Sequence, residues 1–166
     1  NQGFTVDGTL IQSGLVISLE KYANAYGWKN LFADGALAEF MWSDDGSTWG
    51  SGNLYGISPV AEDVIVYYNK DKLNSLGLSV PSTFAEFENA LKVSKDAGEL
   101  PIALGGADGW PIIHVWGLVE GAHVDPSQTR SWIFNAKNTD YSTPDRMKAA
   151  EKLADMASAG YFGSDS

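Results

Sequence analysis

Four residues of the sequence have side chains suited to recognition or catalysis. Glu62 and Asp63 stand side by side at the start of an apolar run, and Asp108 and Trp110 follow a glycine-rich turn. Carboxylates accept charge-assisted hydrogen bonds from hydroxyl groups, and aromatic rings pack on the apolar C–H faces of sugars. Aromatic residues also make up 12% of the chain. These features together favour a carbohydrate as the partner of these residues.

The same residues also have ordinary structural interpretations. Successive side chains of a strand point to opposite faces, so only one of Glu62 and Asp63 can face a given cleft. On residue type alone, a solvated pair of acids is the simpler interpretation. Asp108 could cap the helix that follows it, and Trp110 could pack into the core. A carbohydrate hydrolase is a further alternative, with Glu62 or Asp63 acting together with Asp108 across a glycosidic bond.

Helix signals recur along the chain. Apolar spacing and terminal glycines predict helices over 15–26, 31–42, 71–76 and 111–121. The pair Thr83 and Glu86 matches the capping box, which predicts a helix from 84 to about Gly98. Thr143 before Pro144 predicts another helix start. The buried face of that helix is expected to contain Met147, Ala150, Ala154 and Ala157.

Strand signals lie between these helices. Short β-branched, aromatic or apolar runs predict strands over 54–57, 64–68 and 101–104. The turn-rich stretch 44–53 is predicted to be an exposed loop or the tip of a hairpin. Strands that alternate with helices of about 10 to 15 residues indicate an α/β fold with a largely parallel sheet.

Composition excludes several classes of protein. Hydrophobic residues make up 44% of the 166 residues, enough for a folded core. The net charge of -10 disfavours nucleic acid and anionic membrane surfaces as partners. Cysteine is absent, which excludes a thiol nucleophile, a thiolate zinc site and disulfides. Neither a phosphate loop nor histidines at metal-ligand spacing occur, so the sequence predicts no cofactor and no metal.

Four segments carry a family pattern: IQSGLV (11–16), NLYGISPVAEDVIVYYNKD (53–71), LSVPSTFAEF (78–87) and PIALGGADGWP (101–111). They resemble the extracellular solute-binding proteins of sugar ABC transporters, the maltose-binding-protein-like family. The Tyr68-Asn69-Lys70-Asp71 motif matches residue for residue, whereas Phe84 stands where the family frequently has Trp.

The resemblance implies roles for particular residues. A glutamate six residues before the Tyr-Asn-Lys-Asp motif contacts the sugar in the family, and Glu62 stands at that position. The loop after residue 104 is expected to bring Asp108 and Trp110 to the ligand. Asp7 and Phe4 correspond to the acid and the ring that the first lobe often supplies.

The resemblance also implies a fold and a function. We expect part of a type II-like periplasmic-binding-protein fold, without the family's first strands and C-terminal part. Residues 1–60 are assigned to the first lobe and hinge approach, and residues 61–166 to the main part of the second lobe. The expected function is extracytoplasmic, non-catalytic binding of a sugar or oligosaccharide for an ABC transporter permease. Membrane attachment is expected only through a lipid anchor outside these residues. The hydrolase and a non-catalytic interaction domain remain the alternatives.

Overall fold

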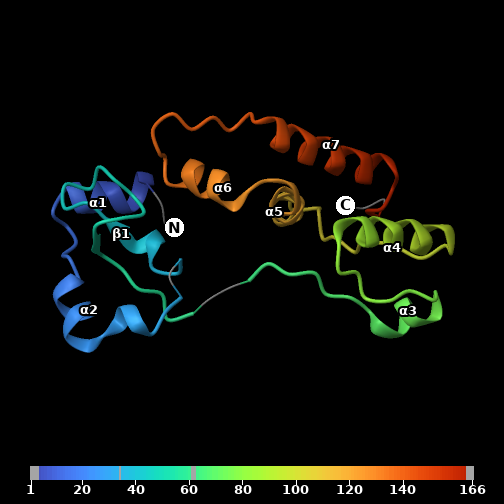
Figure 1. The fold of residues 1–166 in the computed structure, drawn as a ribbon, viewed down its shortest axis with the longest axis horizontal. Coiled ribbons are helices and arrows are strands. Elements are labelled where there is room, and N and C mark those ends of the chain that lie inside the picture. Colours follow the sequence, from blue (N-terminus) through green and yellow to red (C-terminus); the bar gives the residue numbers. More distant parts are fainter. Residues whose placement is uncertain (1–3, 34, 61–62, 164–166) are drawn as a thin grey trace. The chain divides into compact units, whose positions relative to one another are not determined.

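The chain forms two compact units in the computed structural model, which describes residues 4–33, 35–60 and 63–163. Unit 1 comprises Asn1–Glu62 and Arg130–Thr139, and unit 2 comprises Asp63–Thr129 and Asp140–Ser166. Figure 1 shows the order of the elements along the chain. The structure is rich in helices, and each unit has a small hydrophobic core of its own.

Unit 1 is made of short elements. Its helical segments are η1 (Phe4–Gly8), α1 (Thr9–Gln12), α2 (Glu20–Tyr26), η2 (Trp28–Asn30) and η3 (Ala38–Phe40). Its strands are β1 (Met41–Trp42) and β2 (Asn53–Leu54), which pair antiparallel with Met41 opposite Leu54 and Trp42 opposite Asn53. The backbone N–H of Tyr55 donates to the carbonyl of Phe40 (2.9 Å) and extends this pairing.

The core of unit 1 joins α2 to the hairpin. Ala23, Leu37 and Leu54 are buried together, with aromatic residues packed around them. The Glu20 carboxylate accepts a hydrogen bond from the backbone N–H of Leu54 (3.2 Å) and binds Lys29 (2.5 Å). The hydrogen bond from Lys29 is the main reason why the pKa of Glu20 is lowered.

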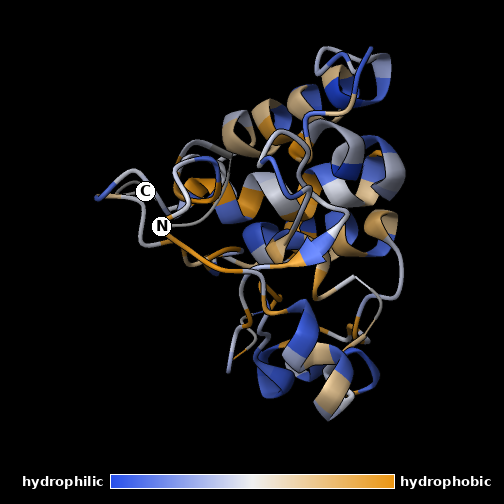
Figure 2. Ribbon diagram, turned by 90° about the vertical axis from the view of Figure 1, so that its left-hand side faces the viewer, coloured by the Kyte–Doolittle hydropathy of each residue, from blue (hydrophilic) through white to orange (hydrophobic). Residues whose placement is uncertain are grey.

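Unit 2 is made of longer helices: α3 (Lys70–Ser75), α4 (Phe84–Asp96), α5 (Ile112–His123) and α7 (Pro144–Ser158). Helix α5 packs against α7 and is viewed almost along its axis in Figure 1. The core contains Leu91, Val119, Ala149 and Met156. Figure 2 shows apolar and polar residues mixed along the helical ribbons, as expected of helices with one buried face. A further helix, α6 (Pro126–Ile133), contains residues of both units.

The predicted helix starts of unit 2 are confirmed. Thr83 caps α4 and Thr143 caps α7, each by accepting a hydrogen bond from the backbone N–H three residues later. The capping box differs in one detail, because the Glu86 carboxylate accepts from the backbone N–H (2.7 Å) and the hydroxyl (2.8 Å) of Ser82. Helix α3 also lies within one residue of its predicted position.

Two helix predictions in unit 1 are wrong in part. Helix α2 begins at Glu20 rather than residue 15, because the backbone N–H of Leu19 donates instead to Leu54 of β2 (2.6 Å). The predicted helix over 31–42 is replaced by turns, η3 and β1. Strand pairing with Asn53–Leu54 outweighs the local helical pattern there, since pairing also buries Trp42 and Leu54.

The predicted parallel sheet is also wrong. Among the described residues, the paired strands are β1 and β2, which are antiparallel, and parallel pairing is confined to a single bridge between Ile102 and Phe162. Residues 64–68 are extended and exposed rather than a buried strand. A β-branched run fits a strand but forms one only when a neighbouring chain segment accepts its hydrogen bonds.

The buried face of α7 differs from the expected one. Arg146, Ala149 and Met156 are buried, whereas all four predicted residues are exposed: Met147, Ala150, Ala154 and Ala157. The predicted face is offset because it followed the alanine-rich stripe and did not include Arg146, whose charge is buried in an ion pair with Glu120. No helix in the described parts of the chain is long and apolar enough to cross a membrane.

Candidate functional site

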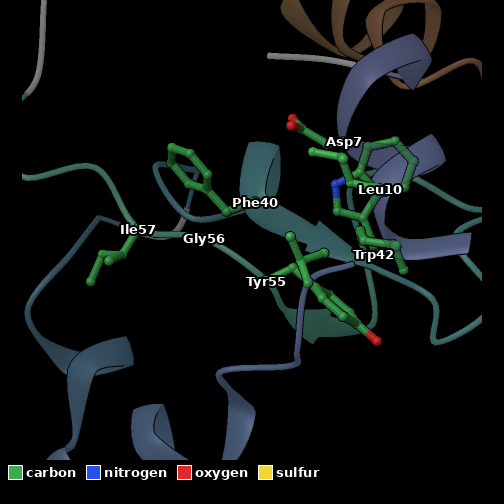
Figure 3. A pocket seen from close by; sticks show the side chains of 9 residues that line it. Asp7, Leu10, Phe40, Trp42, Tyr55, Gly56 and Ile57 are labelled. Atoms are coloured by element: carbon green, nitrogen blue, oxygen red, sulfur yellow. The ribbon is translucent and has the colours of Figure 1, made fainter. Parts of the chain in front are cut away.

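A cavity of about 230 Å³ lies in unit 1 (Figure 3). One carboxylate, three aromatic rings and several aliphatic side chains surround it. The lining residues are Asp7, Leu10, Ile11, Val16, Phe40, Trp42, Tyr55, Gly56 and Ile57. A single carboxylate among apolar and aromatic groups is the pattern of a small-molecule site, in which a few polar groups orient the ligand.

Two of the aromatic residues come from the short stretch where η3 leads into β1. Phe40 ends η3 and Trp42 ends β1, two positions later, and both side chains line the cavity. The chain approaches both rings closely: a Cβ on Gly8 would lie 3.0 Å from the Trp42 ring, and a Cβ on Gly56 would lie 2.8 Å from the Phe40 ring. Glycine at positions 8 and 56 therefore leaves room for the Trp42 and Phe40 rings, which line the cavity.

The Tyr55 hydroxyl is directed outward. Figure 3 shows it pointing away from Asp7, and it donates to the Asp44 carboxylate (3.1 Å). The same carboxylate oxygen accepts from the Asn53 amide (2.7 Å). Burial, followed by the hydrogen bond to Asp44, raises the pKa of Tyr55. The ring of Tyr55 lines the cavity while its hydroxyl braces the hairpin.

An aromatic stack supports the cavity from behind. Trp42 is only 1% exposed and stacks on Trp49, with ring centroids 5.6 Å apart. Trp49 meets Phe134 edge-on at 4.9 Å, and its indole N–H donates to the carbonyl of Glu39 (2.7 Å). Trp49 lies in the loop that the sequence predicted to be exposed, and packing in fact accounts for it. Two aromatic residues close together in the sequence, Phe40 and Trp42, were the signal that could have indicated this site.

In unit 2, Asp108 and Trp110 lie together on the exposed loop before α5. The loop turns at Gly109, which has a positive φ of 76° and donates to the Gly106 carbonyl (2.8 Å). The Trp110 side chain is 63% exposed, and its ring meets His114 edge-on at 5.4 Å. A braced but exposed indole beside a carboxylate can stack on one face of a ligand while the acid accepts hydrogen bonds.

Two of the ordinary interpretations are therefore wrong for these residues. Trp110 does not pack into the core, and Asp108 does not cap α5. The N-cap of α5 is Pro111, without a side-chain hydrogen bond. The backbone carbonyl of Asp108 accepts from the Trp110 N–H (2.9 Å), and its side chain is exposed.

Unit 2 also has an apolar cavity of about 570 Å³. Its lining residues are Leu104, Gly106, Gly109, Ile112, Trp116, Ala150, Leu153, Ala154, Ala157 and Phe162. The alanines that were expected to form the buried face of α7 thus line a cavity. None of the lining residues carries a charge, so this surface offers no carboxylate to a hydroxylated ligand.

The other predicted residues do not extend either site. Glu62 lies outside the described residues, and the same holds for the side chain of Phe4. Asp63 is exposed at the start of unit 2, and Asp7 is half-buried in unit 1. Within the described residues, no three acidic or histidine side chains are grouped in a way that could hold a metal ion.

Comparison with known proteins identifies the family. A sequence profile of bacterial extracellular solute-binding proteins matches residues 5–166. The chain belongs to this family. Membership places this solute-binding protein outside the cytoplasm, in agreement with the prediction from the sequence.

Two curated relatives are sugar-binding proteins of streptococci. The multiple sugar-binding protein of Streptococcus mutans serotype c is 32% identical over 102 residues, which cover 60% of this chain and 23% of the relative. A maltooligosaccharide ABC transporter solute-binding lipoprotein of Streptococcus pneumoniae is 36% identical over 77 residues, which cover 41% of this chain and 17% of the relative. The chain thus spans less than a quarter of the length of each relative.

A solved structure has a similar fold. It comes from a study of xylan utilization by the thermophilic bacterium Caldanaerobius polysaccharolyticus, with a TM-score of 0.64 and 28% sequence identity. The match covers 90% of this chain and 35% of the other. The helix-rich mixed structure therefore has a counterpart among solved structures, although the chain spans only about a third of that protein.

Proposed function

We propose that this chain contributes to a sugar-binding protein that delivers its ligand to an ABC transporter permease without chemical change. The observation that carries the proposal is the exposed Trp110 ring beside Asp108 on one loop of unit 2. Family membership and relatives named for sugar binding support it. The solute-binding relatives also favour a non-catalytic role over the hydrolase alternative.

The proposal assigns the family's type II-like architecture to the chain. Residues 1–60 then belong to the first lobe and hinge approach, and residues 61–166 to the second lobe. Asp7 contacts the sugar from the first lobe, and Asp108 and Trp110 contact it from the second. Glu62 and Asp63 are the further proposed sugar ligands, and Glu62 has the sequence position at which the resemblance implies a sugar-binding acid. Ligand closure of two such lobes creates the state that a permease recognises.

The cavity linings favour an uncharged ligand. Neither the cavity of unit 1 nor that of unit 2 is lined by Lys or Arg, and the chain carries a net charge of -10. A carboxylate such as Asp7 or Asp108 accepts hydrogen bonds from hydroxyls, whereas it repels an acidic sugar. Neutral oligosaccharides therefore fit the proposed site better than uronates or phosphorylated sugars.

Calorimetric titration with neutral xylo- and malto-oligosaccharides tests the proposal. Trp110→Ala is expected to weaken binding of the preferred sugar at least tenfold, about 1.4 kcal/mol, because the stacking face is lost. Tyr26→Ala is the matched control, since Tyr26 is an equally exposed ring on α2 that lines neither cavity. Equal affinity of the parent and the Trp110→Ala variant would remove this ring from the site.

Product analysis separates binding from hydrolysis. After prolonged incubation the oligosaccharides should be recovered intact, because the proposal includes no bond cleavage. The appearance of new reducing ends that depend on Asp108 would instead support the hydrolase.

A further inference from the structure

A buried ion pair joins α5 to α7 in unit 2. Glu120 and Arg146 are the buried charged residues of the described structure, with exposures of 8% and 3%. The Arg146 Nε donates to the Glu120 carboxylate at 2.6 Å. Removing two charges from water is costly, so such a pair persists only when further hydrogen bonds satisfy the remaining donors and acceptors.

The other donors of Arg146 point to two separate stretches of chain. One terminal nitrogen (Nη2) donates to the Thr129 hydroxyl (3.3 Å), which itself donates to Glu120 (3.2 Å). The other (Nη1) donates to the backbone carbonyls of Tyr141 (3.2 Å) and Asp140 (3.5 Å). The guanidinium also lies over the Tyr141 ring, 4.6 Å from its centroid.

These two stretches are the ends of a segment that belongs to the other unit. Thr129 directly precedes Arg130–Thr139 and Asp140 directly follows it, and this segment is part of unit 1. Within unit 1 the segment supplies Phe134, which packs on Trp49. Trp49 in turn stacks on Trp42, a lining residue of the cavity in unit 1.

We propose that Arg146 is a positioning residue that fixes both ends of the segment Arg130–Thr139, where the chain leaves unit 2 and where it returns to it. The planar guanidinium suits this task because it presents donors in several fixed directions, which a lysine ammonium does not. Glu120 holds the guanidinium in place, and Thr129 and the two carbonyls receive its outward donors. The alternative is that the pair only stabilises the α5–α7 core.

A double substitution separates these two roles. Replacing a buried ion pair by apolar residues often preserves stability, so Glu120→Leu with Arg146→Met should fold with a melting temperature close to that of the parent. It nevertheless lacks every donor to Thr129, Asp140 and Tyr141. Hydrogen exchange at the amides of Phe134 and Ala136 should then accelerate at least about tenfold, while exchange in α4 stays unchanged.

The matched control removes another ion pair of α7. Lys152 binds Glu88 of α4 (2.7 Å), and this ion pair joins α7 to α4 rather than to Thr129, Asp140 or Tyr141. Glu88→Leu with Lys152→Met should leave exchange at Phe134 and Ala136 at the parent rate. If exchange there is also unchanged in the Glu120→Leu/Arg146→Met protein, the pair serves only the core and the proposal is wrong.

Milder variants keep the test decisive if the double variant does not fold. Thr129→Val preserves the shape of that side chain and removes one anchor, so exchange should accelerate at the amides of 130–134. Arg146→Lys keeps the charge beside Glu120 but loses the donors to both ends, so exchange should accelerate throughout 130–139. Parent-like exchange in both variants, or an equal acceleration across all of unit 2, would overturn the proposal. The test needs no ligand and does not depend on the proposed sugar binding.

Discussion

The two units differ in whether the residues of the candidate site also belong to the hydrophobic core. Unit 2 buries apolar faces of α4, α5 and α7, and its candidate residues Asp108 and Trp110 lie on an exposed loop outside that core. Unit 1 has short helices and two-residue strands. Two of the side chains that line its cavity, Trp42 and Ile11, are also among its most buried.

Mutations at the two sites should therefore differ in their effect on stability. In unit 2, a change of ligand contact should leave the fold intact, because Asp108 and Trp110 are exposed and lie outside the hydrophobic core. In unit 1, the cavity and the fold share residues, so a change to the cavity wall also removes packing. Residues on a loop that a rigid core supports can be replaced with little loss of stability, because they are not part of the core packing.

The largest expected effect comes from Trp42→Ala. This substitution removes a fully buried ring and its stack on Trp49, which should destabilise unit 1 by about 3–5 kcal/mol. Hydrogen exchange read by mass spectrometry should show loss of protection in β1 and β2 but native protection in α4 and α7. Trp110→Ala is the matched control, and its effect on stability should stay within about 0.5 kcal/mol. Similar losses from both substitutions would contradict the contrast between the units.

Alanine substitutions at one glycine of each unit test how tightly the backbone is packed there. Gly52 in unit 1 has a φ of 103°, and a Cβ there would lie 2.3 Å from the Trp42 carbonyl oxygen. Gly77 in unit 2 has a φ of 70°, with nothing within 4 Å of its Cβ position. We expect Gly77→Ala to cost about 1–2 kcal/mol for the left-handed conformation alone.

Gly52→Ala adds a backbone collision to that cost, so it should destabilise unit 1 by about 2–4 kcal/mol. Urea unfolding followed by exchange in each unit measures both effects. If the two alanine variants lose the same stability, then the hairpin can shift to accept a Cβ, and its close contact with Trp42 is not needed for the fold.

The sequence predicted the helices of unit 2 well because their signals are local. Thr83 and Thr143 each bind a backbone N–H three residues later, so a short window of sequence contains the whole interaction. The exposed loop before α5 was predicted in the same way, from a glycine-rich turn followed by Pro111. Such signals do not depend on the rest of the fold.

The cavity of unit 1 could not be predicted in this way because its contacts are distant in sequence. Trp49 reaches Phe134, and the Glu20 carboxylate reaches the backbone N–H of Leu54. Neither contact leaves a periodic pattern within a single segment. Pairing of β1 with β2 likewise decides whether residues 41–42 are helical or extended, and the local spacing of 31–42 carries no information about that partner.

The buried Arg146 was missed for a related reason. A charge on a helix is usually exposed, so the alanine stripe of α7 was the natural choice for its buried face. Only the three-dimensional neighbours of Arg146, which include Glu120, Thr129 and Tyr141, make burial of its guanidinium acceptable.

The smallest predicted effect concerns two aspartates, one in each unit, that accept hydrogen bonds from nearby serines. Asp45 accepts from the hydroxyls of Ser43 (2.5 Å) and Ser47 (2.7 Å) and from the Ser47 backbone N–H (3.0 Å), and these bonds lower its pKa to about 2. Asp125 accepts only from the hydroxyl (2.6 Å) and the backbone N–H (2.8 Å) of Ser127, which lower its pKa as well.

We expect both carboxylates to titrate below their ordinary pKa of 3.8, with Asp45 the lower of the two because it accepts one more hydrogen bond. A lowered pKa means that the ionised form stabilises the fold at neutral pH. For Asp45 that contribution is lost as the pH falls from about 4 to about 2. Carbon-detected NMR titration of the side-chain carboxyl groups measures both midpoints. Ser43→Ala should raise the pKa of Asp45 and leave that of Asp125 unchanged. A midpoint of Asp45 at or above that of Asp125 would show that the loop between β1 and β2 does not hold its serine hydroxyls on Asp45 in solution.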